Sequence, residues 1–281
     1  MLLGLREMLF PECKRVIYKK NPLDVVICQL IFPPILKIDT EVPVAFQESI
    51  RKHFPNFSEV SEMLNISIPS GVINQIPPES PDQISKSLSC KNFEFSSEDE
   101  EWKINLTRTF VSLSTKKYKR WETFRKKLNV PFEALKEVYS PDYFLRVGLR
   151  YIDVFNRSFL KLPDTTKWDE LLQPYILGIL GYPQADVKDK VKNFASMYEI
   201  ELSDDGSRVM INTKLVKAVK NDEICFMIDS DFYNANKTPI ESTMERLNFF
   251  NAHASRLIRW CINDRLHAAM DPQPLHERKN E

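Results

Sequence analysis

The stretch from residue 107 to residue 156 constrains the fold of this chain most, because its alternation of apolar and polar residues is the clearest in the sequence. Residues 110–114 alternate with a period of two, which is typical of a half-buried strand. The apolar residues that follow are spaced by three and four, so they share one face of a helix: Tyr118, Trp121, Phe124 and Leu128. The pattern predicts a strand, then a helix with one buried face, then a second strand.

Pro131 predicts that the helical segment is divided. Proline has no N–H group and disfavours the helical conformation of the preceding Val130, so we expect two pieces, residues 116–128 and 131–139. The second strand covers residues 144–155. We expect one of its faces to carry Leu145, Val147, Leu149 and Tyr151, and the other to carry Arg146, Gly148, Arg150 and Ile152.

Short strands are expected on both sides of this stretch. An apolar, β-branched run predicts a buried strand over residues 24–32, and Pro43 opens a helix that continues to about Phe54. Residues 55–87 are expected to form loops with one or two short strands. The remaining strands are expected at residues 92–95, 102–106, 194–202, 208–215 and 224–232, and the short turns between them favour antiparallel meanders.

A capping box at residues 238–241 predicts the start of a second long helix. Its apolar residues recur at helical steps to about Met270, and the residues after Pro272 are expected to form a frayed tail. Each half of the chain therefore reads as an antiparallel meander covered by a long amphipathic helix, which is the α+β class. We expect two pseudo-equivalent halves, residues 1–160 and 161–281, closely packed as one globular unit.

The composition of the chain narrows the classes of function. Because 39 basic and 39 acidic residues cancel, no overall charge attracts nucleic acid or a membrane surface. No window approaches the ~20 apolar residues of a membrane span. The six glycines form no phosphate-binding loop, so we expect no nucleotide hydrolysis of that kind and no cofactor. The five cysteines are odd in number and widely spaced, which favours reduced thiols in the cytoplasm and no zinc site.

The first candidate site is a run of cations in which Glu122 is the only acidic residue. Its members are Lys116, Lys117, Lys119, Arg120, Arg125, Lys126 and Lys127. Cations in the first turn of a helix oppose the helix dipole and repel one another, so the run favours a use such as binding nucleic-acid phosphates or an acidic partner. The alternative is a solvated helix face, partly neutralised by the acidic residues 98–101.

The second candidate site is a pair of aspartates, Asp229 and Asp231, on one side of an expected buried strand. Two such carboxylates can hold a divalent metal for phosphoryl chemistry, but the sequence indicates no third ligand. Alternatively, they form a structural ion pair with Arg146 and Arg150, which also share one face of a strand. The sequence favours this ionic interpretation.

Several segments, taken in order, resemble a family of sporadically distributed bacterial proteins. The segments read NPLDVVICQLIFPPIL, VAFQESIRKHFP, Tyr118-x-x-Trp121-x-x-Phe124, VGLRYID, FMIDSDF and CINDRLHAAM. The resemblance implies a bacterial source and accessory genes of the kind found in defence or mobile-element systems. It implies no particular activity. The chain departs from the family pattern at Asp153, where asparagine is usual, and at Asn263, where threonine is usual, and we assign neither a catalytic role.

The sequence as a whole favours a non-enzymatic binding or assembly subunit that engages a protein partner, because no nucleophile, metal or cofactor constellation stands out. One alternative is a nucleic-acid-binding protein that uses the basic run. Another is a metal-dependent phosphodiesterase or nuclease that uses the aspartate pair. The sequence does not determine an oligomeric state. A pocket lined by convergent titratable groups would favour an enzyme over a binding module.

Overall fold

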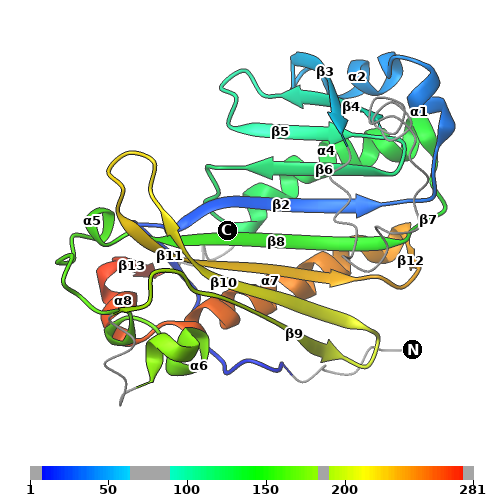
Figure 1. Cartoon of the computed structure of the whole chain (residues 1–281). Coiled ribbons are helices and arrows are strands. Elements are labelled where there is room, and N and C mark those ends of the chain that lie inside the picture. Colours follow the sequence, from blue (N-terminus) through cyan, green and yellow to red (C-terminus); the bar gives the residue numbers. More distant parts are fainter. Residues whose placement is uncertain (1–7, 64–88, 183–189, 275–281) are drawn as a thin grey trace, which may run out of the picture.

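One antiparallel sheet of nine strands organises the molecule (Figure 1). The structure is a computed structural model that describes residues 8–63, 89–182 and 190–274. In spatial order the strands are β3 (Asn56–Met63), β4 (Ser89–Ser96), β5 (Trp102–Leu106), β6 (Phe110–Thr115), β2 (Leu23–Ile31), β8 (Arg146–Phe155), β11 (Ile224–Asn234), β10 (Ser207–Lys217) and β9 (Ala195–Ser203). The α+β class is therefore confirmed, and the two expected meanders are joined in one sheet.

The strand order repeats on either side of the central pair, β2 and β8. Strands β6, β5 and β4 follow outward from β2, and strands β11, β10 and β9 follow outward from β8. On each side, the strand next to the centre is the last of its meander and leads into a long helix. In this order β8 lies next to β11, so it belongs with the strands of the second meander. The expected division at residue 160 stays a prediction.

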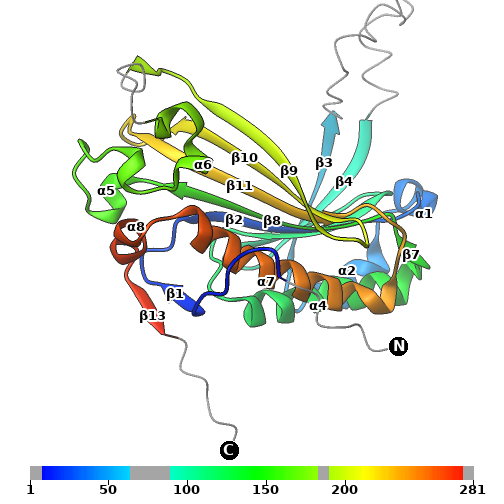
Figure 2. The same cartoon turned by 90° about the horizontal axis from the view of Figure 1, so that it is seen from below.

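The two long helices, α4 (Trp121–Tyr139) and α7 (Thr243–Cys261), lie on the same face of the sheet, together with α2 (Val44–Ile50) (Figure 2). Phe124 of α4 packs against Trp102 of β5, with their ring centroids 5.8 Å apart, while α7 contacts β8 and β11. The indole Nε1 of Trp121 donates a hydrogen bond of 2.8 Å to Asn248 Oδ1. This bond joins the start of one long helix to the middle of the other.

The first long helix differs from its prediction at two places. It begins at Trp121, so residues 116–120 are not helical. It also continues through Pro131 without a break. A proline inside a helix costs about 3 kcal/mol. The apolar stripe continues past it through Phe132 and Leu135, both buried. Burial of this stripe against the sheet offsets the cost, since each buried side chain of this size contributes about 1.5–3 kcal/mol.

The second long helix is shorter than predicted. Thr238–Pro239 form a strand, β12, that pairs with β7 (Tyr143–Phe144), and the expected capping box is absent. A 3-10 turn, η5 (Ile240–Ser242), leads into α7. After α7 ends at Cys261, a separate helix, α8 (Asp264–Ala269), begins where the Asn263 side chain accepts a hydrogen bond of 3.1 Å from the N–H of Leu266.

A small ribbon outside the main sheet includes the first residues of the expected frayed tail. Strand β1 (Val16–Tyr18) pairs with β13 (Pro272–Pro274), and the ribbon lies on the face of the sheet that carries α7 (Figure 2). Residues 275–281 lie outside the described residues, as do residues 64–87 of the expected loop region. The remaining short elements are α1 (Leu36–Thr40), α5 (Arg157–Leu160), η2 (Trp168–Glu170), α6 (Pro174–Leu177) and η3 (Gly178–Gly181). Within the described ranges, no helix combines the length and apolar character needed to cross a bilayer.

Candidate functional site

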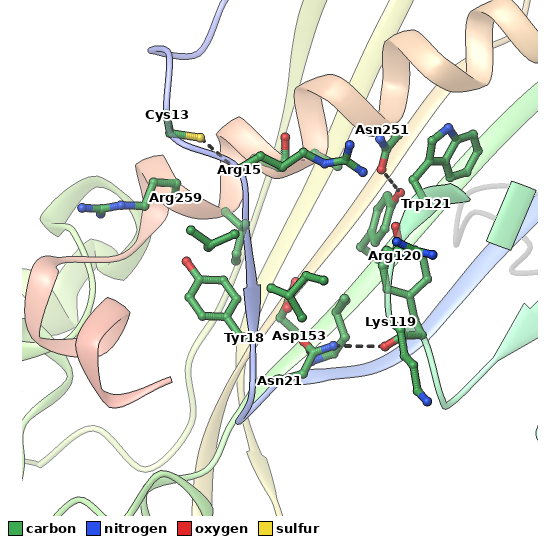
Figure 3. Close-up of a pocket in the computed structure, with 18 of the residues that line it drawn as sticks. Cys13, Arg15, Tyr18, Asn21, Lys119, Arg120, Trp121, Asp153, Asn251 and Arg259 are labelled. Carbon is green, nitrogen blue, oxygen red and sulfur yellow. Dashed lines mark hydrogen bonds between the residues drawn. The ribbon is translucent and has the colours of Figure 1, made fainter. Parts of the chain in front are cut away.

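A pocket with a volume of about 140 Å³ lies between β1, the start of α4, α7 and the centre of the sheet (Figure 3). Residues 13–18 form its outer wall and residues 118–121 one side. Strands β8 and β11 form its floor, and α7 lies along another side. These segments are far apart in sequence, and the two long helices and the ribbon bring them together. The pocket therefore depends on the complete arrangement of the fold.

Of the described residues that line the pocket, Asp153 is the only acidic one. It lies on the helix-covered face of β8, and only 5% of it is exposed. Among the described residues its carboxylate has neither a hydrogen-bond donor nor an ion-pair partner. Burial without a partner disfavours the charged form and raises the pKa of Asp153 to about 7. Ser230, on the neighbouring strand β11, is also buried and also lines the pocket.

Three tyrosines give the pocket much of its inner surface. The Tyr151 hydroxyl donates to Asn251 Oδ1 at 3.1 Å, and the Tyr18 hydroxyl lies 2.8 Å from Nδ1 of His267. The ring of Tyr118 stands edge-on to that of Tyr151, with the centroids 5.8 Å apart. Burial raises the pKa of Tyr18 and of Tyr118 to about 12, so both remain neutral at physiological pH. These rings provide flat apolar surface with polar edges.

Five of the residues that line the pocket are cationic, and they come from three different segments: Lys14, Arg15, Lys119, Arg120 and Arg259. Figure 3 shows Arg259 and Lys119 on opposite sides of Asp153. Arg15 pairs with Glu122 at 2.7 Å, and Arg259 pairs with Asp264. The side chains of Lys119 and Arg120 are exposed, so the mouth of the pocket combines positive charge with access to solvent.

The pocket holds one thiol, that of Cys13, which points to the backbone carbonyl of Ser255 at 3.7 Å. Burial raises the pKa of this thiol above its ordinary value. Because the thiolate is the nucleophilic form, a raised pKa disfavours covalent chemistry at Cys13.

The structure disperses the basic run predicted from the sequence. Lys119 and Arg120 line the pocket, whereas Lys117 pairs with Glu101 at 3.4 Å. Lys127 lies over the rings of Phe54 and Trp102. The remaining members, Lys116, Arg125 and Lys126, are exposed.

The aspartates and arginines of the second candidate site lie on the other face of the sheet from the pocket. Arg150 holds Asp229 with two hydrogen bonds of 2.7 and 2.6 Å. Arg146 holds Asp231 with one of 2.8 Å and lies over the ring of Tyr233. Across the described part of the chain, no cluster of three or more acidic, histidine or cysteine residues is placed to bind a metal. The arrangement is that of two charge-assisted pairs.

The sequence contained one signal for the pocket that was not used. Buried residues alternate along β8 at Val147, Leu149, Tyr151 and Phe155, and Asp153 occupies the fourth position of this series. A carboxylate at a core position is costly and marks a site. The contributions of Arg15, Asn251 and Arg259 have no such signal, because only the fold brings these residues to the same place.

Comparison with known proteins identifies no relative of this chain. No family model matches the chain, and no curated protein matches it either. The resemblance to sporadically distributed bacterial proteins stays a prediction.

Proposed function

We propose that this protein is a binding protein whose ligand is a small organic anion with one aromatic ring. The ring occupies the pocket beneath β1, and the anionic group lies at its mouth. The observation that supports this proposal is a single cavity with tyrosine and apolar walls inside and five cations among its lining residues.

The volume of the pocket favours a ligand with a single ring. An apolar cavity of about 150 Å³ takes up benzene, so about 140 Å³ is the right size for a single six-membered ring. Tyr18 and Tyr118 offer the flat surfaces on which such a ring packs. A larger apolar ligand would have to extend into the mouth, where it would meet charged groups.

The charges of the pocket favour an anion. A ligand that carried only positive charge would approach five cations and find one carboxylate, whereas an anion would be attracted by the whole mouth. Arginine binds phosphate and carboxylate groups in a bidentate manner, and Arg120 is positioned at the mouth for this.

Isothermal titration calorimetry with phenyl phosphate tests the proposal. We expect one site per chain with a Kd below about 1 mM, the range that good packing gives a ligand of this size. Ala254→Phe fills the pocket and should abolish binding, while Ala252→Phe, at an exposed position of the same helix, should leave it unchanged. If phenyl phosphate does not bind, or if it binds equally to both variants, the proposal is wrong.

Several expectations from the sequence remain proposals beside this one. A protein partner, a role in a bacterial defence or mobile-element system, and membership of the sporadically distributed family fit a binding protein but stay predictions. A cytoplasmic location is supported by Cys13, Cys28, Cys225 and Cys261, which are free thiols.

A further inference from the structure

We infer that the ligand of this pocket is a pyrimidine nucleotide of the cytidine type, bound with its base against Asp153 and its phosphate at the mouth. This inference rests on the proposed function and shares its site. It adds the chemistry of the ring, which the size and charge of the pocket leave open.

The inner wall of the pocket has hydrogen-bonding capacity that the protein does not use. Asp153 is 5% exposed and Ser230 is 4% exposed, and neither side chain has a hydrogen-bond partner among the described residues. Buried polar groups in native proteins are nearly always paired, and an unpaired one is costly. A hydrocarbon ring in the pocket would leave both groups unpaired. A ring with N–H groups would satisfy them.

Among single-ring bases, cytosine presents an edge that a buried carboxyl group can pair with in both of its protonation states. Its exocyclic amino group donates a hydrogen bond, and the adjacent ring nitrogen accepts one. A carboxylate accepts from the amino group. A protonated carboxyl also donates to the ring nitrogen, which gives two parallel hydrogen bonds. Because the pKa of Asp153 is about 7, both forms are present at neutral pH, and both bind cytosine.

The other common bases fit less well. Adenine has the same donor–acceptor edge as cytosine, but its two fused rings need more room than a single ring in a pocket of about 140 Å³. Uracil has a single ring and pairs with a protonated carboxyl, but its one free N–H lies between two carbonyl oxygens, which the ionised carboxylate of Asp153 would face. The walls contributed by Tyr18 and Tyr118 allow stacking, which is worth about 1–3 kcal/mol per base and is similar for all bases. The edge of the base and its size therefore decide the selectivity.

The phosphate of the nucleotide explains why cationic residues line the mouth of the pocket. A ribose separates the base from the phosphate, so the phosphate reaches the mouth when the base is inside. Lys119 and Arg120 line the pocket and are exposed, and Lys119 has no ion-pair partner among the described residues. A phosphate placed there replaces solvent as their counter-ion. Free base alone would leave this part of the site unused.

Calorimetric titrations with CMP, UMP, AMP and phenyl phosphate test the inference. We expect CMP to bind at least about tenfold more tightly than each of the other three, because a site built to pair a polar edge rejects ligands that lack it. Asp153→Leu should weaken CMP binding at least about tenfold and leave phenyl phosphate unchanged. Asp153→Asn should retain CMP, because an amide offers the same donor and acceptor as a protonated carboxyl.

Variants at the mouth supply the matched control. Arg120→Gln should weaken CMP and phenyl phosphate alike, and Arg125→Gln, on an exposed part of the same segment, should weaken neither. Binding of phenyl phosphate without tighter binding of CMP would overturn the inference and leave the proposed function standing. Binding of neither ligand would overturn both. Tighter binding of UMP or AMP than of CMP, or no loss of CMP binding in Asp153→Leu, would show that the base is not recognised as inferred.

Discussion

Replacing Asp153 with asparagine should stabilise the protein at alkaline pH and change its stability little in acid. Asparagine has the shape of a protonated aspartate and cannot ionise. In the folded protein the pKa of Asp153 is about 7, against an ordinary value of 3.8, because the carboxylate is buried without a partner. One pKa unit corresponds to about 1.4 kcal/mol, so ionised Asp153 costs the folded state about 4 kcal/mol at most.

The sign of the effect follows from the protons bound in each state. Below pH 3.8 the carboxyl is protonated whether the chain is folded or not, and it contributes nothing. As the pH rises, the unfolded chain ionises first, so the wild-type protein loses stability until the folded pKa is passed near 7. The asparagine variant avoids this loss. Its advantage should be about 1 kcal/mol at pH 4.5 and approach about 4 kcal/mol at pH 8.5.

Urea denaturation of the two proteins at pH 4.5, 6.5 and 8.5 measures the difference directly, because all other titrating groups are common to both. Asp229→Asn is the matched control on the neighbouring strand. It removes a carboxylate that Arg150 holds with two hydrogen bonds, so it should destabilise the protein at pH 8.5. An Asp153→Asn advantage that is the same at all three pH values, or a loss of stability at pH 8.5, would refute the burial argument.

Three further substitutions test the packing of the fold by urea denaturation. Arg150→Met should cost about 1–2 kcal/mol, because its nearly buried carboxylate partner loses two hydrogen bonds, whereas Arg208→Met at an exposed pair should cost under about 0.5 kcal/mol; equal losses would contradict this. Trp121→Phe should cost about 1 kcal/mol by removing the bond that joins α4 to α7, and no loss would show that the bond contributes nothing. Ser140→Gly should stabilise by about 0.5–1 kcal/mol, because Ser140 ends α4 with a φ of 45°, and a destabilised variant would argue against strain there.

The strands could be predicted from the sequence because their signal is local. Along β8, one set of alternate residues points toward the helices and the other set points toward the opposite side of the sheet. A period of two in the sequence indicates this alternation without knowledge of the neighbouring strands. The helix boundaries were harder. Pro131 stops most helices, and only the packing of α4 against the sheet lets this one continue. Leu266 continues the apolar spacing of α7, so the break before α8 was hidden.

The pocket could not be predicted, because its parts are joined by contacts between distant segments. The three-residue pairing of β1 with β13 has no local sequence signal, and without it residues 13–18 would not cover the floor of the pocket. The positions of the basic residues were also hard to predict from the sequence. The sequence grouped Lys119 and Arg120 in one basic run with Arg125, whereas α4 begins only at Trp121 and the first two line the pocket. Only Asp153, a carboxylate in an apolar series, could have been recognised in advance.

The pairing of β1 with β13 also sets the order of events during synthesis. Strand β1 is synthesised about 250 residues before β13, so it stays unpaired until both long helices and every strand of the main sheet have been made. The sheet and both long helices can assemble in the meantime. The pocket is therefore completed only once β13 has been made, and a chain that ends before Pro272 should fold around an uncovered pocket.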